Sequence, residues 1–195
     1  MNDIKQCAVY AASSSLVAPE YMEAAANLGR RLAKEGIGLV YGAGKVGLMG
    51  AVADAALGAG GKVTGVIPQF MVDNGWAHGG LTDLIVTPDM HSRKEKIVSL
   101  ADAAIALPGG VGTLEELCEV ITWKQLGLFL KPIVILNVGG YYDPLLAMLE
   151  SAARGHFMRP EHLKLWRVAR DADEAVEEVL TTPLWDKSIG KFAQI

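Results

Sequence analysis

Short apolar runs, each followed by a longer segment with helical periodicity, are the feature that most constrains the fold of this 195-residue chain. The apolar runs are Gln6–Ala11, Ile37–Tyr41, Lys62–Ile67, Thr82–Thr87, Ala103–Leu107, Pro132–Asn137 and a short run at Leu165–Ala169. Runs that are apolar throughout are typical of parallel strands buried on both faces. We therefore expect a doubly wound, Rossmann-like α/β fold, with a mostly parallel sheet and helices on both faces.

The segments between these runs predict the helices and the domain limits. We expect helices at Glu20–Glu35, Leu48–Leu57, Asp89–Leu100, Leu114 to about Leu126, Pro144–Ala153 and Asp173–Leu180, and a loop at 69–80. No linker or internal repeat divides the chain. The sequence therefore predicts one nucleotide-binding domain over residues 1–180 and a C-terminal tail over 181–195.

The composition sets limits on function. Lys and Arg total 18 and Asp and Glu total 22, so no basic excess exists to bind a phosphate backbone, and we expect no nucleic-acid partner. Two cysteines, Cys7 and Cys118, are too few for a disulfide framework or a four-ligand zinc site, and both are expected to be buried free thiols. Because the chain shows no secretory signal and no apolar run of 18 residues, we expect a cytoplasmic protein that does not bind membranes.

Ligands of doubly wound folds bind beyond the carboxyl ends of the strands, so the loops that follow the strands are the candidate site. The first such loop is Ser13–Ser15. Ser13 is expected either to cap a helix or to form a polar edge of the site, and the sequence leaves both possibilities open.

The second loop, Gly42-Ala43-Gly44-Lys45-Val46-Gly47, matches G-x-G-x-x-G between an expected strand and an expected helix. A dinucleotide site also needs an acid at the end of the next strand, and Lys62–Pro68 contains none, which disfavours NAD(P). Lys45 is not in the G-K-[ST] context of a Walker A motif. Two interpretations stay open: Gly42 and Gly44 allow a tight turn and close packing, or they contribute to a mononucleotide site.

The strongest signal follows the most apolar run. Pro108-Gly109-Gly110-Val111-Gly112-Thr113 leads directly into a helix that carries Glu115, Glu116 and Glu119. Gly109, Gly110, Val111, Gly112 and Thr113 provide backbone N–H groups and a hydroxyl near a helix N-terminus, which is a phosphate-binding arrangement. Acidic side chains in a first helical turn also interact favourably with the helix dipole, which offers a purely structural explanation. A site that binds a phosphate at the glycines and a sugar at a carboxylate explains more of the pattern.

A basic pair lies at another strand end. Arg93 and Lys94 follow His91 and Ser92 at the start of an expected helix, where an arginine can bind a phosphate or pair with a carboxylate. His78 and His91 are not at a metal-ligand spacing, so we expect no metal and no cofactor.

Several of these motifs together resemble the LOG ("Lonely Guy") family. The residues that carry the resemblance are Met90-His91-Ser92-Arg93-Lys94 and Ala104–Glu116, supported by Gly47–Gly50, Gly65–Pro68, Gly80–Thr82, Thr122–Gly127 and Asn137–Asp143. Members of this family are cytokinin riboside 5′-monophosphate phosphoribohydrolases, often mislabelled lysine decarboxylases. The resemblance covers about residues 6–180 and implies hydrolysis of the N-glycosidic bond of (N6-modified) adenosine 5′-monophosphates.

The resemblance also implies roles for individual residues. The essential arginine and glutamate of the family fall on Arg93 and Glu116, its phosphate loop on Gly110–Thr113 and a further substrate contact on Thr122, with Lys94 beside the arginine. The family usually carries a glutamate a few residues before the H-x-G-L-T stretch, where this chain has Gly75. We expect that Asp73, two residues away, can substitute for this missing carboxylate.

Two other functions compete with this interpretation. A molybdenum-cofactor carrier would use a similar glycine loop without catalysis, and a broader nucleotide nucleosidase would lack a preference for N6 substituents. A lysine decarboxylase is disfavoured because no recognisable lysine context for pyridoxal phosphate occurs. The presence of both Arg93 and Glu116 favours an enzyme.

The chain is also expected to form a homodimer. Its mean hydropathy is +0.26, and apolar side chains crowd the stretch Trp123–Leu130. An apolar surface of this kind usually marks an interface, and the family resemblance points the same way.

Overall fold

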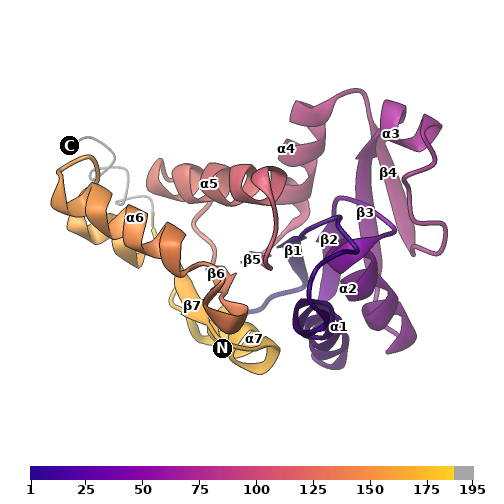
Figure 1. Ribbon diagram of the computed structural model, residues 1–195, viewed down its shortest axis with the longest axis horizontal. Helices are drawn as coiled ribbons and strands as arrows, with labels where there is room; N and C mark the ends of the chain where they lie inside the picture. The colour runs from indigo at the N-terminus through magenta and orange to yellow at the C-terminus, as the bar shows by residue number, and fades with distance from the viewer. Residues whose placement is uncertain (187–195) are drawn as a thin grey trace.

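The computed structural model describes residues 1–186 and shows a sheet of seven parallel strands (Figure 1). The strand order is β4-β3-β2-β1-β5-β6-β7, and every neighbouring pair is parallel. The strands are β1 (Gln6–Tyr10), β2 (Gly38–Tyr41), β3 (Val63–Pro68), β4 (Asp83–Thr87), β5 (Ala103–Ala106), β6 (Ile133–Leu136) and β7 (Arg167–Ala169). The doubly wound fold predicted from the apolar runs is confirmed.

Helices cover both faces of the sheet (Figure 1). The α-helices are α1 (Pro19–Lys34), α2 (Gly47–Gly58), α3 (Gln69–Asp73), α4 (Met90–Leu100), α5 (Val111–Gln125), α6 (Asp143–Arg154) and α7 (Ala172–Thr181), with short 3-10 helices η1 (Val138–Gly140) and η2 (Pro160–Lys164). One apolar cluster joins the sheet to α1, α2 and α7, and a second joins it to α4, α5 and α6. The strands are apolar on both sides because they supply both clusters.

Three details differ from the sequence predictions. Residues 69–80 are not all loop, because Gln69–Asp73 forms the short helix α3. Helix α5 begins at Val111, three residues earlier than expected, so Val111, Gly112 and Thr113 form its first turn. Cys7 is buried as predicted, but Cys118 is exposed on α5, so the prediction for the second thiol is wrong.

The first residues of the predicted tail pack against the domain. The side-chain amide of Asn2 donates to the carbonyl of Thr182 at 2.8 Å, and the backbone N–H of Trp185 donates to Leu130 at 3.0 Å. Lys124 lies with its Nζ 5.8 Å from the centre of the Trp185 ring. The rest of the predicted tail, residues 187–195, lies outside the described residues, and the boundary at 180 stays a prediction.

Across residues 1–186, no helix is long and apolar enough to cross a membrane. The same residues contain no cluster of three His, Cys, Asp or Glu side chains arranged to hold a metal ion.

Candidate active site

The candidate site lies where the strand order reverses. β1 pairs with β2 on one side and with β5 on the other, so the loops after β1 and β5 diverge at the carboxyl edge of the sheet. Two backbone hydrogen bonds join the chain at the start of these loops, before they diverge: Leu107 N donates to Tyr10 at 2.9 Å, and Ala12 N donates to Pro108 at 3.2 Å. This part of the sheet edge is the expected ligand position of a doubly wound fold.

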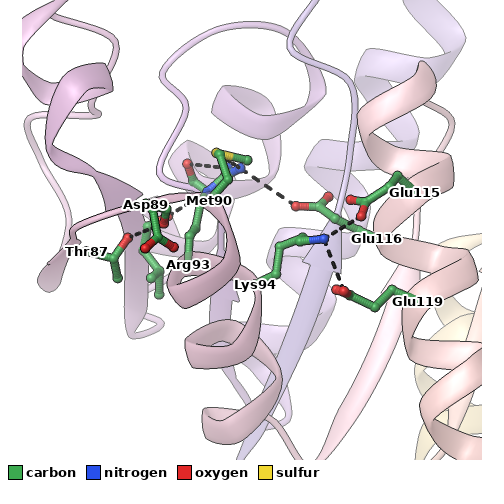
Figure 2. Close-up of polar contacts among 10 residues, drawn as sticks. Thr87, Asp89, Met90, Arg93, Lys94, Glu115, Glu116 and Glu119 are labelled. Carbon is green, nitrogen blue, oxygen red and sulfur yellow. Dashed lines mark hydrogen bonds and ion pairs between the residues drawn. The ribbon is translucent and has the colours of Figure 1, made fainter.

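Arg93 reaches this site from the first turns of α4. The N-cap Asp89 fixes the start of the helix by accepting from Ser92 N at 2.8 Å. The Arg93 side chain is buried, and two of its nitrogens donate to backbone carbonyls, Nε to Val66 at 3.1 Å and Nη2 to Gly42 at 3.0 Å. Nη1 is directed toward Glu116 of α5, at 3.8 Å from its Oε1 (Figure 2). Arg93 is therefore held by the backbone and presents one side of its guanidinium to the carboxylate.

Glu116 is an unusual carboxylate. Burial raises its pKa to about 7, and the positive charge of Arg93 offsets only part of that effect. The contact at 3.8 Å is long for an ion pair, so Arg93 stabilises the ionised form weakly. A carboxyl group that titrates near neutral pH can exchange protons with water or a substrate at physiological pH.

Lys94 bridges the two helices beside this pair. Its Nζ forms ion pairs with Glu115 and with Glu119, the latter at 3.1 Å (Figure 2). The hydrogen bond to Glu115 is the main reason that the pKa of Lys94 is raised. These two ion pairs link α4 to α5 beside Arg93 and Glu116, and the predicted role of Lys94 in substrate binding stays a prediction.

The glycine loop after β5 forms the N-terminus of α5. Gly110 is the N-cap residue, and a Cβ at Gly110 or at Gly112 would meet no other atom within 4 Å. Gly109 differs, because a Cβ there would lie 2.1 Å from Oγ1 of the buried Thr113. Gly109 therefore makes room for Thr113, while a side chain at Gly110 or Gly112 would point into open space. Val111 between them is 83% exposed, so its side chain does not pack into the core.

The loop after β2 contacts the guanidinium of Arg93. A Cβ at Gly42 would lie 1.8 Å from Nη2 of Arg93, so only glycine lets the guanidinium reach the Gly42 carbonyl. Gly44 makes similar room for Met49 of α2, since a Cβ there would lie 2.9 Å from its Sδ. These contacts favour the packing interpretation of Gly42 and Gly44 over direct phosphate binding.

Ser13 and Thr122, two other predicted site residues, make no described contact with Arg93 or Glu116. Ser13 is exposed after β1, with its backbone against Gly47. Thr122 is exposed on α5, where its hydroxyl donates to Cys118 at 2.8 Å. Six positions separate it from Glu116, so it points about 120° away around the helix. No described contact joins Thr122 to the pair.

Gly75 follows α3 in a loop beside the Gly42–Gly47 loop. Lys45 Nζ donates to the Gly75 carbonyl at 2.5 Å, and Ala77 forms an isolated bridge with Gly44. Gly75 has a φ of +70°, and a Cβ there would meet no atom within 4 Å. Asp73 accepts a hydrogen bond from Gln69 at 2.8 Å on the surface of α3.

Sequence reasoning missed some supports of the site. Tyr141 donates its hydroxyl to the Gly109 carbonyl at 2.6 Å, and Tyr142 donates to Leu107 at 2.7 Å, so the two tyrosines hold the glycine loop. Their place after β6, the next strand along the sheet, is the only sequence signal for this role. The carbonyls of Val66 and Gly42 carry no signal, because any residue provides a carbonyl.

Two solved structures with a similar fold are named for the molybdenum cofactor. The carrier from Chlamydomonas reinhardtii superposes with a TM-score of 0.69 and 23% identity over 90% of this chain and 95% of that one. A molybdenum cofactor binding protein from Rippkaea orientalis gives 0.67 and 24%, over 89% and 93%. At these identities the likeness concerns the fold alone.

The sequence comparisons are closer. A family model described as "Possible lysine decarboxylase" matches residues 49–179. A cytokinin riboside 5′-monophosphate phosphoribohydrolase from Rhodococcoides fascians is 48% identical over 161 residues, 82% of this chain and 81% of the relative. LOG7 from Arabidopsis thaliana, named as the same enzyme, is 42% identical over 193 residues, 94% of this chain and 89% of the relative. This chain therefore belongs to the LOG family.

Proposed function

We propose that this protein hydrolyses the N-glycosidic bond of N6-modified adenosine 5′-monophosphates and releases the free base, a cytokinin, and ribose 5-phosphate. Curated relatives that span most of the chain carry the name of this activity. The observation that carries the proposal is the largely buried Glu116 carboxyl, which titrates near neutral pH, faces Arg93 and lies in the second turn of α5.

The chemistry needs a stabilised cation and an activated water. As the bond between ribose C1 and the base nitrogen breaks, its electron pair leaves on the base and the ribosyl group becomes cation-like, as in glycoside cleavage. Water adds to C1, Glu116 accepts the proton that this water loses, and the departing base takes up a proton. The negative charge of Glu116 stabilises the cation, and Arg93 orients that charge.

One assay distinguishes this function from its competitors. The protein is incubated with AMP and with N6-isopentenyl AMP, and the released base is quantified by chromatography. Release mainly from the N6-modified nucleotide supports the proposal, and equal release from both indicates a broader nucleosidase. Release from neither, with binding of a phosphorylated pterin, would indicate a carrier. We propose a cytoplasmic location and no cofactor for this enzyme.

A homodimer is expected in solution. Leu126 and Leu128, at the end of α5 and in the loop after it, are 51% and 71% exposed, whereas Phe129 in the same stretch is buried. Light scattering at micromolar concentration should give twice the chain mass of 20.7 kDa. The double variant Leu126→Asp, Leu128→Asp should be monomeric, and the matched variant Phe157→Asp, another highly exposed apolar residue, should stay dimeric. A wild-type monomer would contradict the prediction.

The substitute role of Asp73 for the family glutamate predicts an effect on substrate binding. Asp73→Ala should raise KM about 10- to 150-fold, the effect of one lost hydrogen bond to a charged group. Gln69→Ala is the matched control, because it removes the partner of Asp73 and leaves the carboxylate free. A change in KM of less than twofold for Asp73→Ala would refute the substitution.

The converse experiment restores the family glutamate. Gly75→Glu should lower KM, but the positive φ of Gly75 costs about 1–2 kcal/mol of stability for any residue with a side chain. Gly75→Ala carries the same strain without the carboxylate. The affinity of Gly75→Glu is therefore compared with that of Gly75→Ala rather than with the wild type.

A further inference from the structure

Tyr10 is the last residue of β1 and lies beneath the two helices that carry the site. Helices α4 and α5 both pack over β1. Its side chain is 3% exposed and belongs to the same apolar cluster as Ile97 of α4 and Leu117 of α5. The hydrogen bond from Leu107 N to the Tyr10 carbonyl fixes this residue to the strand end that leads into the glycine loop.

The hydroxyl of Tyr10 behaves differently from those of the other buried tyrosines. Tyr41 donates to Gly44 at 3.3 Å and Tyr142 donates to Leu107 at 2.7 Å. Within residues 1–186, the hydroxyl of Tyr10 makes no hydrogen bond to protein. The same residues contain no fully enclosed side-chain N or O atom without a partner, so the Tyr10 oxygen opens onto space outside the packed core. A phenylalanine would fill the core equally well, so packing does not explain the hydroxyl.

The charges around this hydroxyl are the carboxylates of α5. Burial is the main cause of the raised pKa of Tyr10, and the negative charge of Glu116 is the next, ahead of Cys7, Glu119 and Glu115. Glu116 is therefore the carboxylate that acts most strongly on this hydroxyl, and its chain neighbour Leu117 packs in the same apolar cluster as the Tyr10 ring. At any pH below its raised pKa, Tyr10 is neutral and can donate a hydrogen bond.

The carboxylate of Glu116 can accept more hydrogen bonds than the described residues donate to it. Its one described contact is with Arg93 at 3.8 Å, and no described group donates a hydrogen bond to it. A carboxylate can accept about four hydrogen bonds. An available donor on β1 and an available acceptor on α5 therefore face the same partly buried space, and buried polar groups of this kind are usually joined through ordered water.

We propose that Tyr10 is a positioning residue for Glu116, and that the Tyr10 hydroxyl and the Glu116 carboxylate hold one water molecule between them. The water donates to Glu116 and accepts from Tyr10, which leaves its second lone pair directed into the site. In the proposed reaction, on which this last step rests, that water attacks ribose C1. Tyr10 itself exchanges no proton.

The variant Tyr10→Phe tests the proposal with a measurement that needs no activity. The charged groups that face Glu116 are Arg93 and Lys94 of α4 and Glu115 and Glu119 of α5, and Tyr10→Phe leaves all four in place. The bridging water donates a hydrogen bond to the ionised carboxylate and so lowers its pKa. Tyr10→Phe removes the group that holds this water, so the pKa of Glu116 should rise by about half a unit to one unit. The titration is followed by 13C NMR of the ligand-free protein, with Glu116→Gln used to assign the signal.

Kinetics provide the second readout. Tyr10→Phe should lower kcat about tenfold with KM within twofold, because one hydrogen bond to the attacking water is lost and substrate contacts remain. The acid limb of the pH–rate profile should move to higher pH together with the NMR titration. The control Tyr142→Phe removes a tyrosine hydroxyl that bonds to Leu107, so it should lower stability and leave the Glu116 titration at the wild-type pH.

The outcomes separate this proposal from the proposed function. An unchanged Glu116 titration in folded Tyr10→Phe, checked by circular dichroism, overturns the positioning role whatever the enzyme hydrolyses. A shifted titration in a protein whose wild type releases no base supports the link between Tyr10 and Glu116 and overturns the proposed reaction. A fall in kcat without a shifted titration also counts against the proposal, because a general packing defect would produce it.

Discussion

Glu116→Gln is expected to lower base release by about 10²- to 10⁴-fold while the protein remains folded. Glutamine keeps the shape of the side chain but can neither accept the proton of the attacking water nor stabilise a cation-like ribose by charge. The wild type should lose activity as the pH falls below about 7, where Glu116 takes up a proton. Base release is measured under saturating substrate, with Glu95→Gln on the exposed face of α4 as the control.

The same variant is expected to be more stable than the wild type at high pH. The pKa of Glu116 is about 7 in the folded protein and 4.5 for an unperturbed glutamate, so folding favours the protonated form. The folded state therefore binds more protons between these values, and wild-type stability falls as the pH rises through this window. Glutamine does not ionise, so at pH 8 Glu116→Gln should gain up to about 3 kcal/mol relative to the wild type, and at pH 4 almost nothing. Urea unfolding at both pH values measures the difference, and an equal difference at both would contradict it.

Arg93→Ala should also abolish activity, but with the opposite effect on stability. Its side chain donates to the carbonyls of Val66 and Gly42, and its removal leaves both without a partner and creates a cavity. Each unsatisfied buried carbonyl costs about 1–3 kcal/mol, so the melting temperature should fall. Lys96→Ala, another cation of α4, should change neither property appreciably. Activity loss with a stability gain in Glu116→Gln would identify Glu116 as a group maintained at the expense of stability, while the stability loss in Arg93→Ala would identify Arg93 as part of the support of the fold.

The sequence predicted the parts of this site that are governed by local pattern. Apolar runs indicate parallel strands, and parallel strands bring the loop at Ser13 and the glycine loop at Gly109 to one edge. The contacts of Arg93 with two backbone carbonyls could not be predicted, because they depend on the position in which α4 packs against β2 and β3. The requirement for Gly42 has the same origin, since a Cβ there would occupy the position of the guanidinium.

The start of α5 and the exposure of Cys118 were mispredicted for related reasons. Glycine has a low helix propensity, so Gly112 suggested a loop, but tertiary packing of Thr113 against Gly109 extends the helix through it. Cys118 lies among apolar neighbours in sequence, yet its position on α5 is turned away from the sheet. Apolar neighbours along the chain indicate which helix is buried but not which of its faces.

The largest substrate effect should come from the 5′-phosphate. The riboside is expected to show a kcat/KM at least about 10³-fold below that of its monophosphate. Two or three charge-assisted hydrogen bonds from the first turn of α5, aided by the helix dipole, supply binding energy of that size. Such remote binding can lower the barrier at the ribose as well as KM. Steady-state kinetics with the paired substrates measure the ratio, and comparable values for both would refute the requirement.

A methyl group placed in the open space of the glycine loop should selectively weaken use of the phosphate. A Cβ at Gly112 meets no protein atom within 4 Å, so Gly112→Ala should fold normally and occupy space that a phosphate at the helix N-terminus would need. We expect its kcat/KM for the monophosphate to fall at least tenfold, while the low value for the riboside stays unchanged. Gly58→Ala on α2, also without a neighbour within 4 Å, is the matched control and should alter neither substrate. An equal loss for both substrates in Gly112→Ala would mean that the loop supports the fold of the site rather than binding the phosphate.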